Sequence, residues 1–195
     1  NEPLFRRYMA KAKKSAVQIV KKKWVPMYAS HEFNKQRIGE TYITKPQDAL
    51  GKHVTMNLMT LTLDPKKQNL SVSFVVDSLE QDGVGCSCVG FQMSPVSLKK
   101  IVKRGRTKIS DSFTVQSKDK KTVRIKPIIL TRSHASQSVC TQLRTQARSL
   151  IAVSLSKSPY SQFVRDVLSK KIQRSVHEML KKTAPLSVCD IRAFK

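Results

Sequence analysis

Residues 70–91 read LSVSFVVDSLEQDGVGCSCVGF, and this stretch decides the fold class. In residues 70–76, apolar side chains at every second position alternate with serine, serine and valine. A period of two is typical of a half-buried β-strand. A second strand is predicted over residues 84–91, after the turn segment Gln81-Asp82-Gly83. Two strands joined by so short a link predict an antiparallel hairpin.

Similar patterns recur on both sides of this hairpin. The links between them, residues 64–69 and 117–121, are rich in residues that favour turns. Short strands joined by close turns indicate an antiparallel sheet with a β-barrel-like curl, to which the last strand returns. The further strands are predicted over residues 53–63, 113–117, 123–130 and 188–194.

Three helices interrupt or follow the strands. The first opens at Ser94-Pro95, a helix-start signal, and runs to Val102. Apolar residues at helical spacing predict a second helix over residues 136–151. A third, which again opens with a serine-proline pair, is predicted over residues 158–182. Strands and helices in this order predict one α+β domain, which covers residues 22–195.

A basic arm, residues 1–21, precedes this domain. Residues 1–23 carry eight basic side chains and a single acid, Glu2. The apolar residues among them make only a weak helical stripe, so we interpret the segment as an arm that becomes ordered on RNA. A mitochondrial presequence is the competing interpretation, because basic, acid-poor N-termini look alike.

The charge of the chain indicates a polyanionic partner. Its 195 residues hold 37 Lys and Arg against 13 Asp and Glu, a net charge of +24, while 39% hydrophobic residues supply a core. So much charge on a body of this size repels itself unless a polyanion neutralises it. A membrane is the weaker candidate, since no apolar run approaches the ~18–20 residues of a spanning helix. Nucleic acid is therefore the predicted partner.

The basic residues are concentrated in the second half of the chain. Residues 99–195 carry 23 basic and 5 acidic side chains, whereas residues 1–98 carry 14 and 8. The densest cluster lies at the end of the first predicted helix and in the loop around Gly105, where several cations can follow a phosphate backbone. An ordinary solvated helix end is the plainer alternative. The cluster comprises Lys99, Lys100, Lys103, Arg104, Arg106 and Lys108.

Further cations share one side of the element that carries them. Residues one turn apart on a helix, or two apart on a strand, project in the same direction. Such stripes are often merely solvated, but on an acid-poor segment they favour RNA. The residues that complete the predicted RNA-binding set are Arg144 and Arg148 in the second helix, Lys170 and Arg174 in the third, Arg124 and Lys126 in the strand 123–130, and Lys21, Lys22 and Lys23 before the domain.

Aromatic residues make up only 6% of the chain and do not interleave with basic ones. This composition argues against a protein that reads single-stranded RNA by stacking on its bases. Trp24 follows three lysines and is placed to stack on a base, but a single Trp is more often part of the core. We therefore expect Trp24 to be buried.

No pattern in the chain predicts catalysis, a metal or a cofactor. Nucleophile-elbow and phosphate-cradling glycine motifs are missing. The four histidines offer no paired spacing that would complete a zinc site with cysteine. We expect no disulfide framework in a chain of this length, which favours a reducing compartment. The expected structural thiols are Cys86, Cys88, Cys140 and Cys189.

Taken in order, several short motifs give the chain a family likeness. It resembles the archaeal and eukaryotic small-subunit ribosomal proteins of the S-three-Ae type, also termed e-type S-one, over about residues 22–192. The chain departs from that family's pattern at Ala29-Ser30, Gly105, Lys120 and Ala184, which puts the local turn at Lys120 in doubt. The motifs that carry the likeness are Lys22-Lys23-Trp24, Phe33, Ile38-Gly39-Glu40-Thr41, Gly51-Lys52, Arg106-Thr107-Lys108-Ile109, Val123-Arg124-Ile125-Lys126-Pro127, Leu143-Arg144, Pro185-Leu186 and Ile191-Arg192.

The resemblance implies a β-barrel-like core with flanking helices, seated on small-subunit rRNA. It places the protein on the platform of the subunit, near the messenger exit and the 3′ end of the RNA, among neighbouring ribosomal proteins. It implies no enzyme activity, no small-molecule substrate and no membrane. The expected location is the cytoplasmic ribosome, with assembly beginning in the nucleolus in a eukaryote.

Two other function classes compete with a structural ribosomal protein. A free-standing RNA chaperone or ribosome assembly factor needs the same charge, so composition does not separate it. A basic nuclease would need clustered acids for a metal ion. The acids of residues 64–82 lie on or beside predicted turns without a metal-ligand pattern.

Overall fold

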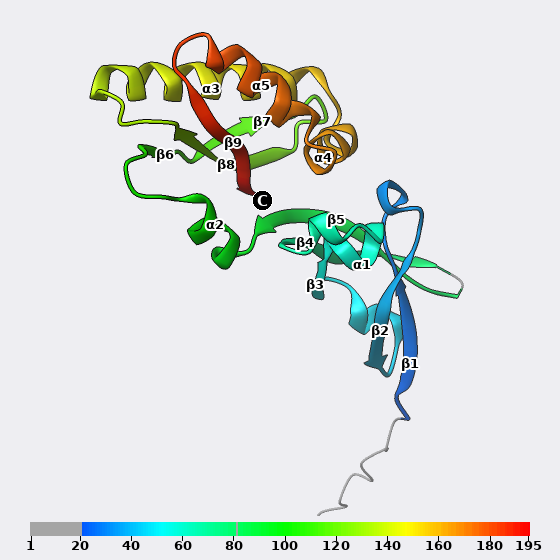
Figure 1. Cartoon of the computed structure of the whole chain (residues 1–195). Helices are drawn as coiled ribbons and strands as arrows, with labels where there is room; N and C mark the ends of the chain where they lie inside the picture. Colours follow the sequence, from blue (N-terminus) through cyan, green and yellow to red (C-terminus); the bar gives the residue numbers. More distant parts are fainter. Residues whose placement is uncertain (1–20, 81) are drawn as a thin grey trace, which may run out of the picture.

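A nine-stranded sheet runs through the part of the chain that the structure, a computed structural model, describes: residues 21–80 and 82–195 (Figure 1). The strands are β1 (Lys23–Tyr28), β2 (Arg37–Ile43), β3 (His53–Asn57), β4 (Leu70–Glu80), β5 (Gly83–Met93), β6 (Lys108–Ser110), β7 (Phe113–Gln116), β8 (Thr122–Thr131) and β9 (Leu186–Phe194). The helices are α1 (Leu58–Thr62), α2 (Pro95–Ile101), α3 (Gln137–Lys157), α4 (Tyr160–Leu168) and α5 (Lys171–Lys181). Short 3-10 turns occupy η2 (His31–Phe33), η3 (Pro46–Ala49) and η4 (Pro65–Lys67).

Strand β5 joins the two halves of the molecule. Along one edge it pairs antiparallel with β4 from end to end. Its other edge is shared, because β1 pairs with it in parallel near Val84 and β9 pairs with it antiparallel near Phe91. An N-terminal lobe (residues 21–93) and a C-terminal lobe (residues 108–195) therefore meet along one strand, with α2 between them (Figure 1).

Gly83 allows β1 to lie against β5. A Cβ atom at this position would come within 2.5 Å of the Pro26 carbonyl oxygen and 2.8 Å of the Tyr28 ring. Contacts this short are sterically forbidden. A residue without a side chain is therefore required where the β1–β2 hairpin joins the sheet.

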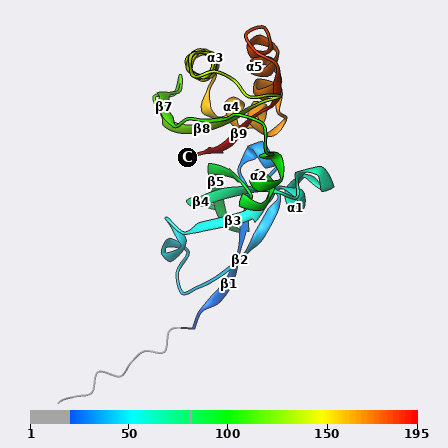
Figure 2. The ribbon, with the colours of Figure 1, turned by 60° about the vertical axis from the view of Figure 1, so that its left-hand side comes forward.

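Helices α3, α4 and α5 cover one face of the strands of the C-terminal lobe (Figures 1 and 2). Residues at helical spacing point inward from the helices, and alternate residues of β8 point toward them. Burying these side chains removes apolar surface from water, the main stabilising contribution to folding. The fully buried members of this core include Ile125, Ile129, Leu143, Leu155, Phe163 and Leu180.

Phe194, at the end of β9, connects the two lobes. Its ring stacks on Phe91 of β5 at a centroid distance of 5.7 Å and meets Phe163 of α4 edge-on at 5.9 Å. Such aromatic pairs contribute about 0.5–1.5 kcal/mol each beyond their buried area. The lobes are thus joined by packing as well as by strand pairing.

The predicted α+β class is confirmed. Strands occupy residues 70–80, 83–93, 113–116 and 122–131, and the last strand returns to the sheet between β5 and β8. The barrel-like description holds only loosely, because the sheet is open and is not closed on itself. The turn at Lys120, which the departure from the family pattern put in doubt, is present. Lys120 adopts the left-handed conformation there, with φ of 59°.

The predicted strand over residues 53–63 is wrong in its second half. Strand β3 ends at Asn57, whose side chain accepts a hydrogen bond of 2.9 Å from the Met59 backbone N–H. An asparagine in this position caps a helix N-terminus, and α1 begins at the next residue. The link at residues 64–69 therefore connects a helix to β4 and is not a hairpin turn.

The predicted helix over residues 158–182 is two helices. Lys170 takes a left-handed conformation with φ of 59° and separates α4 from α5. The buried Gln173 side chain donates a hydrogen bond of 3.0 Å to the Val167 carbonyl, across this break. The apolar spacing continues through both helices, which is why it did not reveal the break.

Three strands, β1, β2 and β6, were missed by the sequence prediction. Residues 23–28 and 37–43 form an antiparallel hairpin, although the first contains Pro26 and the second contains Gly39 and two charged residues. A proline counts against a central strand in sequence reasoning. The predicted basic arm lies outside the described residues, apart from Lys21.

Candidate nucleic-acid interface

A groove of about 540 Å³ lies where the two lobes meet. We call it the junction groove. One wall is apolar and comes from the end of β5 and from α2, with Phe91, Met93 and Leu98. The opposite wall comes from β8, β9 and the last residue and is basic. Its cations are Arg124, Lys126, Arg192 and Lys195. Figures 1 and 2 show the C-terminal end of the chain between the lobes.

The pairing of β8 with β9 places these cations together. On β8, Val123 and Ile125 are buried, so Arg124 is turned to the opposite face. The register between the two strands skips Arg192, which lies in a bulge, and bulges commonly redirect a side chain. Two backbone hydrogen bonds, of 2.7 and 3.0 Å, fix Lys195 against Arg124.

The junction groove is suited to an anion. No acidic residue lines it, although His53 and several uncharged residues do. Within residues 21–80 and 82–195, none of the ion pairs includes one of its four Lys and Arg residues. Like charges in a hollow with apolar walls concentrate a positive potential, which attracts phosphates.

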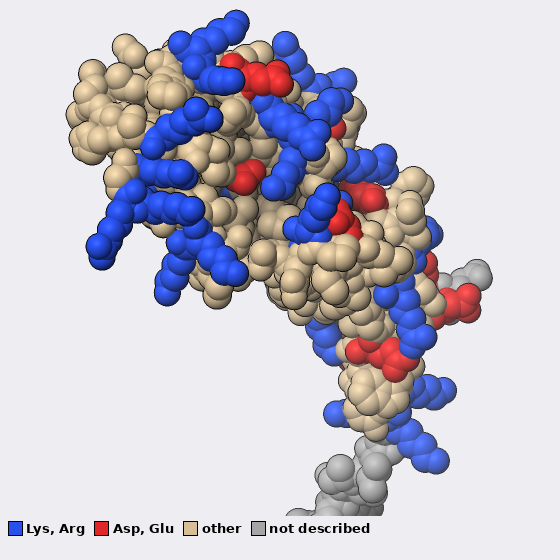
Figure 3. Space-filling view, viewed as in Figure 1, with Lys and Arg blue, Asp and Glu red and all other residues tan. Residues whose placement is uncertain are grey.

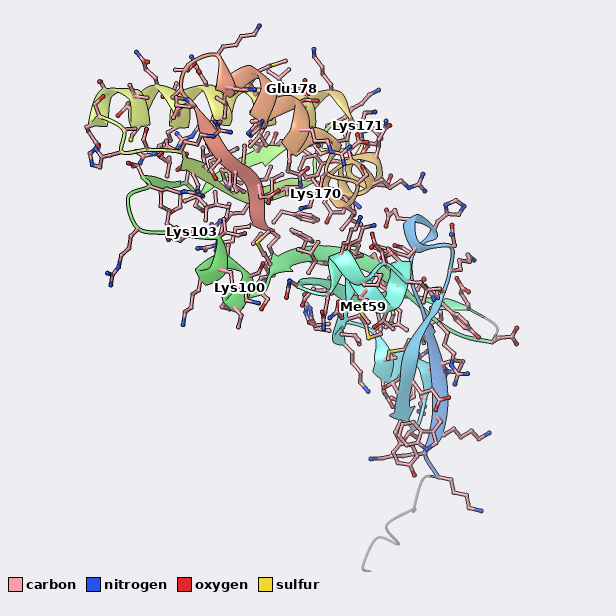
Figure 4. All side chains as sticks on the ribbon, in the orientation of Figure 1. Met59, Lys100, Lys103, Lys170, Lys171 and Glu178 are labelled. Atoms are coloured by element: carbon pink, nitrogen blue, oxygen red, sulfur yellow. The ribbon has the colours of Figure 1, made fainter. Side chains whose placement is uncertain are left out.

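The basic loop, residues 99–108, continues from this groove. Helix α2 lines the groove with Pro95 and Leu98, and its next residues are Lys99 and Lys100. Figure 3 shows Lys and Arg side chains gathered over α2 and the segment that follows it, and Figure 4 labels Lys100 and Lys103 there. The exposed cations of the basic loop are Lys99, Lys100, Lys103, Arg104 and Lys108.

Gly105 shapes this loop. Its φ is +76°, a conformation that side-chain-bearing residues rarely adopt, and no atom lies within 4 Å of where a Cβ would be. The glycine is therefore needed for the turn of the backbone, and the space beside it is open.

Arg106 differs from the other cations of the basic loop. It is half-buried, and its Nη1 donates a hydrogen bond of 2.7 Å to the Ser187 hydroxyl of β9. Arg104 is exposed, whereas Arg106 attaches the loop to the sheet. Only Arg104 has its whole guanidinium group available to a phosphate.

The two predicted arginines of α3 also have separate surroundings. Arg148 forms a bidentate ion pair with Asp111, with an Nη2–Oδ2 distance of 2.9 Å, and lies over the Phe113 ring. Arg144 is half-buried, and its Nε has no hydrogen-bond partner among the described residues. Arg148 is thus already paired with a carboxylate, which weakens the case for a phosphate contact.

Lys170 and Arg174 lie away from the groove, at the start of α5 (Figure 4). Lys170 Nζ lies 3.9 Å from Asp190 Oδ1. Burial raises the pKa of Asp190, although Lys170 and His177 oppose this rise. Arg174 is exposed.

The structure therefore brings together only part of the predicted set. Arg124 and Lys126 join the basic loop through α2, whereas Lys21, Lys22 and Lys23 lie at the outer end of β1 (Figure 1). Sequence reasoning missed Arg192 and Lys195. Arg192 could have been found from the predicted strand over residues 188–194. Side chains alternate along a strand, so the position after buried Ile191 faces away from the core.

The thiols and carboxylates suggest no reactive centre. All four cysteines are free, and burial raises the pKa of Cys88 and of Cys189 to about 12. With so high a pKa these thiols stay protonated at neutral pH, and a protonated thiol is a weak nucleophile and a weak metal ligand. In the described part of the chain, no three His, Cys, Asp or Glu residues gather as metal ligands would. Among the same residues, no helix has both the length and the apolar character needed to cross a membrane.

Comparison with known proteins agrees with this picture. The sequence model of the Ribosomal S3Ae family matches residues 10–195. The chain is 29% identical over 174 residues to the small ribosomal subunit protein eS1 of Nanoarchaeum equitans, covering 89% of this chain and 88% of that protein. It is 28% identical over 183 residues to the protein of the same name from Methanococcus maripaludis, covering 93% and 81%. The eS1 protein of Methanoculleus marisnigri is 26% identical over 174 residues, covering 89% and 88%.

Proposed function

The chain belongs to the Ribosomal S3Ae family, and on this premise we propose that it holds folded rRNA in the small ribosomal subunit, mainly by contacts to phosphates. The relatives named above are proteins of the small ribosomal subunit, which supports a structural role in that particle. A structural role needs stable contacts to RNA and assigns no reaction to the protein.

The observation that carries the proposal is the junction groove with its adjoining basic loop. Four cations without an acid line the groove, and five exposed cations follow along α2 and the loop. Each Lys or Arg that neutralises a phosphate releases condensed counterions, which favours binding. Phosphate contacts fix the position of a protein on RNA without reading its sequence. This suits a protein that holds an already folded RNA.

The resemblance to the family supports a further proposal about where the protein lies in the particle. We place it on the platform of the small subunit, near the messenger exit and the 3′ end of the rRNA, beside other small-subunit proteins. There it would stabilise RNA during assembly and translation on the cytoplasmic ribosome. The predicted arm of residues 1–21 would add further phosphate contacts in front of the domain of residues 22–195.

Association with the mature subunit separates this proposal from a free-standing RNA chaperone or assembly factor. We expect the full chain to remain with mature small subunits on a sucrose gradient after a wash at moderate salt. Release into the free fractions, with binding only to immature particles, would favour the assembly factor.

A charge-reversed variant links that association to the groove. Arg124→Glu with Arg192→Glu should release the protein from the subunit at lower salt than wild type, because two phosphate contacts become repulsive. The matched control is Lys118→Glu with Lys157→Glu, which reverses two exposed charges outside the groove and the basic loop. Equal release by both variants would show that net charge alone, and not the groove, determines binding.

A further inference from the structure

Trp24 and Tyr42 form an exposed aromatic pair at the outer end of the β1–β2 hairpin. They lie directly opposite each other in the antiparallel register, so their rings share one face of the hairpin. The ring centroids are 5.0 Å apart, with an interplanar angle of 38°. The expectation that Trp24 belongs to the core is wrong, because 65% of Trp24 and 51% of Tyr42 are exposed.

This exposure is unusual within the molecule. Every other aromatic residue that the structure describes is buried or half-buried. An aromatic cross-strand pair stabilises a hairpin by roughly 0.2–1 kcal/mol, but that role would not require more than half of each residue to stay in contact with water. The free ring surface is therefore available for a partner.

Cations surround the pair. Lys22 lies two residues before Trp24, on the same face, and its Nζ is 5.7 Å from the centroid of the Tyr42 ring. Lys21 and Lys23, the sequence neighbours of Lys22, are also exposed. No acidic residue occurs in residues 21–28 or 41–47, the segments that build this end of the hairpin.

We propose that Trp24 and Tyr42 are a stacking platform for one unpaired RNA base, with Lys22 beside a flanking phosphate. This inference rests on the proposed function, namely that the chain binds rRNA. A flat apolar ring next to a positive charge matches a nucleotide, which joins a flat base to a phosphate. Bases stack on aromatic side chains with little sequence preference, because every base has a π-face.

The platform would add a second kind of contact to the phosphate contacts of the groove. Unpaired bases in loops, bulges and ends of folded RNA are open to aromatic side chains, whereas paired bases are not. Figure 1 shows that the open end of the β1–β2 hairpin, where β1 begins and β2 ends, lies far from the C-terminal lobe. The protein would thus hold a paired region at one end and an unpaired nucleotide at the other.

The chain has a single Trp, so its tryptophan emission reports on Trp24 alone. We would titrate the full chain with a twelve-nucleotide oligoadenylate and, in parallel, with a fully paired RNA duplex. The expected result is saturable quenching of Trp24 emission by the oligoadenylate and much weaker quenching by the duplex. Acrylamide should quench Trp24 readily before RNA is added.

Variants test the energetic share of the platform. Trp24→Ala should weaken binding of a labelled oligoadenylate by about 5- to 150-fold, the range expected for losing one base stack. Trp24→Phe, which keeps a ring, should restore most of that affinity. The matched control is Met179→Ala, which removes a half-exposed apolar side chain from α5 and should leave the affinity unchanged.

The outcomes separate the platform from the proposed function. Steep salt-dependent binding of whole rRNA that Trp24→Ala does not alter, with no quenching by oligoadenylate, overturns the platform and leaves the proposed function standing. Trp24 that acrylamide does not reach in the free protein is already covered by the chain itself, which also overturns the platform. The platform is likewise overturned if Trp24 emission responds to other small-subunit proteins but not to RNA. If the wild-type chain binds neither the oligoadenylate nor rRNA, the proposed function is refuted as well.

Discussion

Arg104 and Arg106 are two residues apart in the basic loop, yet their surroundings differ. Arg104 is exposed, whereas Arg106 is half-buried and hydrogen-bonded to Ser187. Reversing an exposed charge changes folding stability little. Removing a half-buried donor costs about 1 kcal/mol, because its acceptor loses a partner. Substitution of Arg104 should therefore affect RNA binding, whereas substitution of Arg106 should affect folding stability.

We expect Arg104→Glu to weaken rRNA binding with the midpoint of urea unfolding unchanged. Arg106→Ala should instead lower the free energy of unfolding by about 1 kcal/mol. Filter binding and urea denaturation on both variants, with Lys157→Glu as the control for a reversed charge elsewhere, check this. Equal loss of stability in both would mean that the hydrogen bond to Ser187 does not distinguish them.

The Asp190 carboxyl gives the protein a pH-dependent stability. Burial raises its pKa, so the folded state binds the proton more tightly than the unfolded state. Ionised Asp190 therefore costs stability at neutral pH, and this cost disappears as the pH falls through the pKa. Asp190→Asn should raise the free energy of unfolding at pH 7, and the gain should shrink toward acidic pH. A gain that grows on acidification would show that the ion pair with Lys170 outweighs burial.

Thiol reactivity should follow burial. The pKa of Cys88 rises from an ordinary 9.0 to about 12, which leaves roughly a thousandth of the usual thiolate at pH 8. We expect iodoacetamide to modify Cys88 and Cys189 slowly in the native protein and rapidly in urea, as mass spectrometry of digests would show. Rapid alkylation of the native protein at these sites would mean that β5 and β9 open readily.

At the scale of the elements, the break between α4 and α5 depends on one residue. Lys170 adopts a left-handed conformation that costs a side-chain-bearing residue roughly 1–2 kcal/mol and glycine almost nothing. Lys170→Gly should therefore raise the unfolding free energy by up to about 1 kcal/mol, since the half-exposed ion pair that it removes is worth little. Glu178→Gly, within α5, should lower it by about 0.5–1 kcal/mol. Thermal or urea unfolding compares the two variants, and a loss of stability in both would contradict this account of the break.

Elements could be predicted where local pattern alone decides them. Alternation in residues 70–76 predicts β4, and alternation in residues 123–126 followed by the apolar run 127–130 predicts β8. The change from β3 to α1 depends on a side-chain cap at Asn57, and the break at Lys170 on one backbone angle. Neither leaves a mark in hydrophobic spacing. The hairpin of β1 and β2 was missed because β1 contains Pro26 and β2 contains Gly39 and two charged residues, which weaken a strand pattern.

At the scale of the whole molecule, the sign of the charge could be predicted but its arrangement could not. Counting residues predicts a polyanionic partner and a dense basic loop. The junction groove, however, arises where β9 pairs with both β8 and β5, which brings Arg124 and Lys126 beside Arg192 and Lys195. Contacts between residues this far apart in the sequence are set by tertiary packing. Burial likewise decides which cations stay available, as Arg106 and Arg148 show.

The central claim is that phosphate contacts dominate the binding of rRNA, and the salt dependence of affinity tests it most directly. If about eight phosphates are neutralised, the logarithm of the affinity for small-subunit rRNA should fall with the logarithm of salt concentration with a slope of about −6 to −7. A filter-binding titration of the full chain across salt concentrations gives this slope. A slope near zero would contradict the account, because the groove and the basic loop would then not be bound to phosphates.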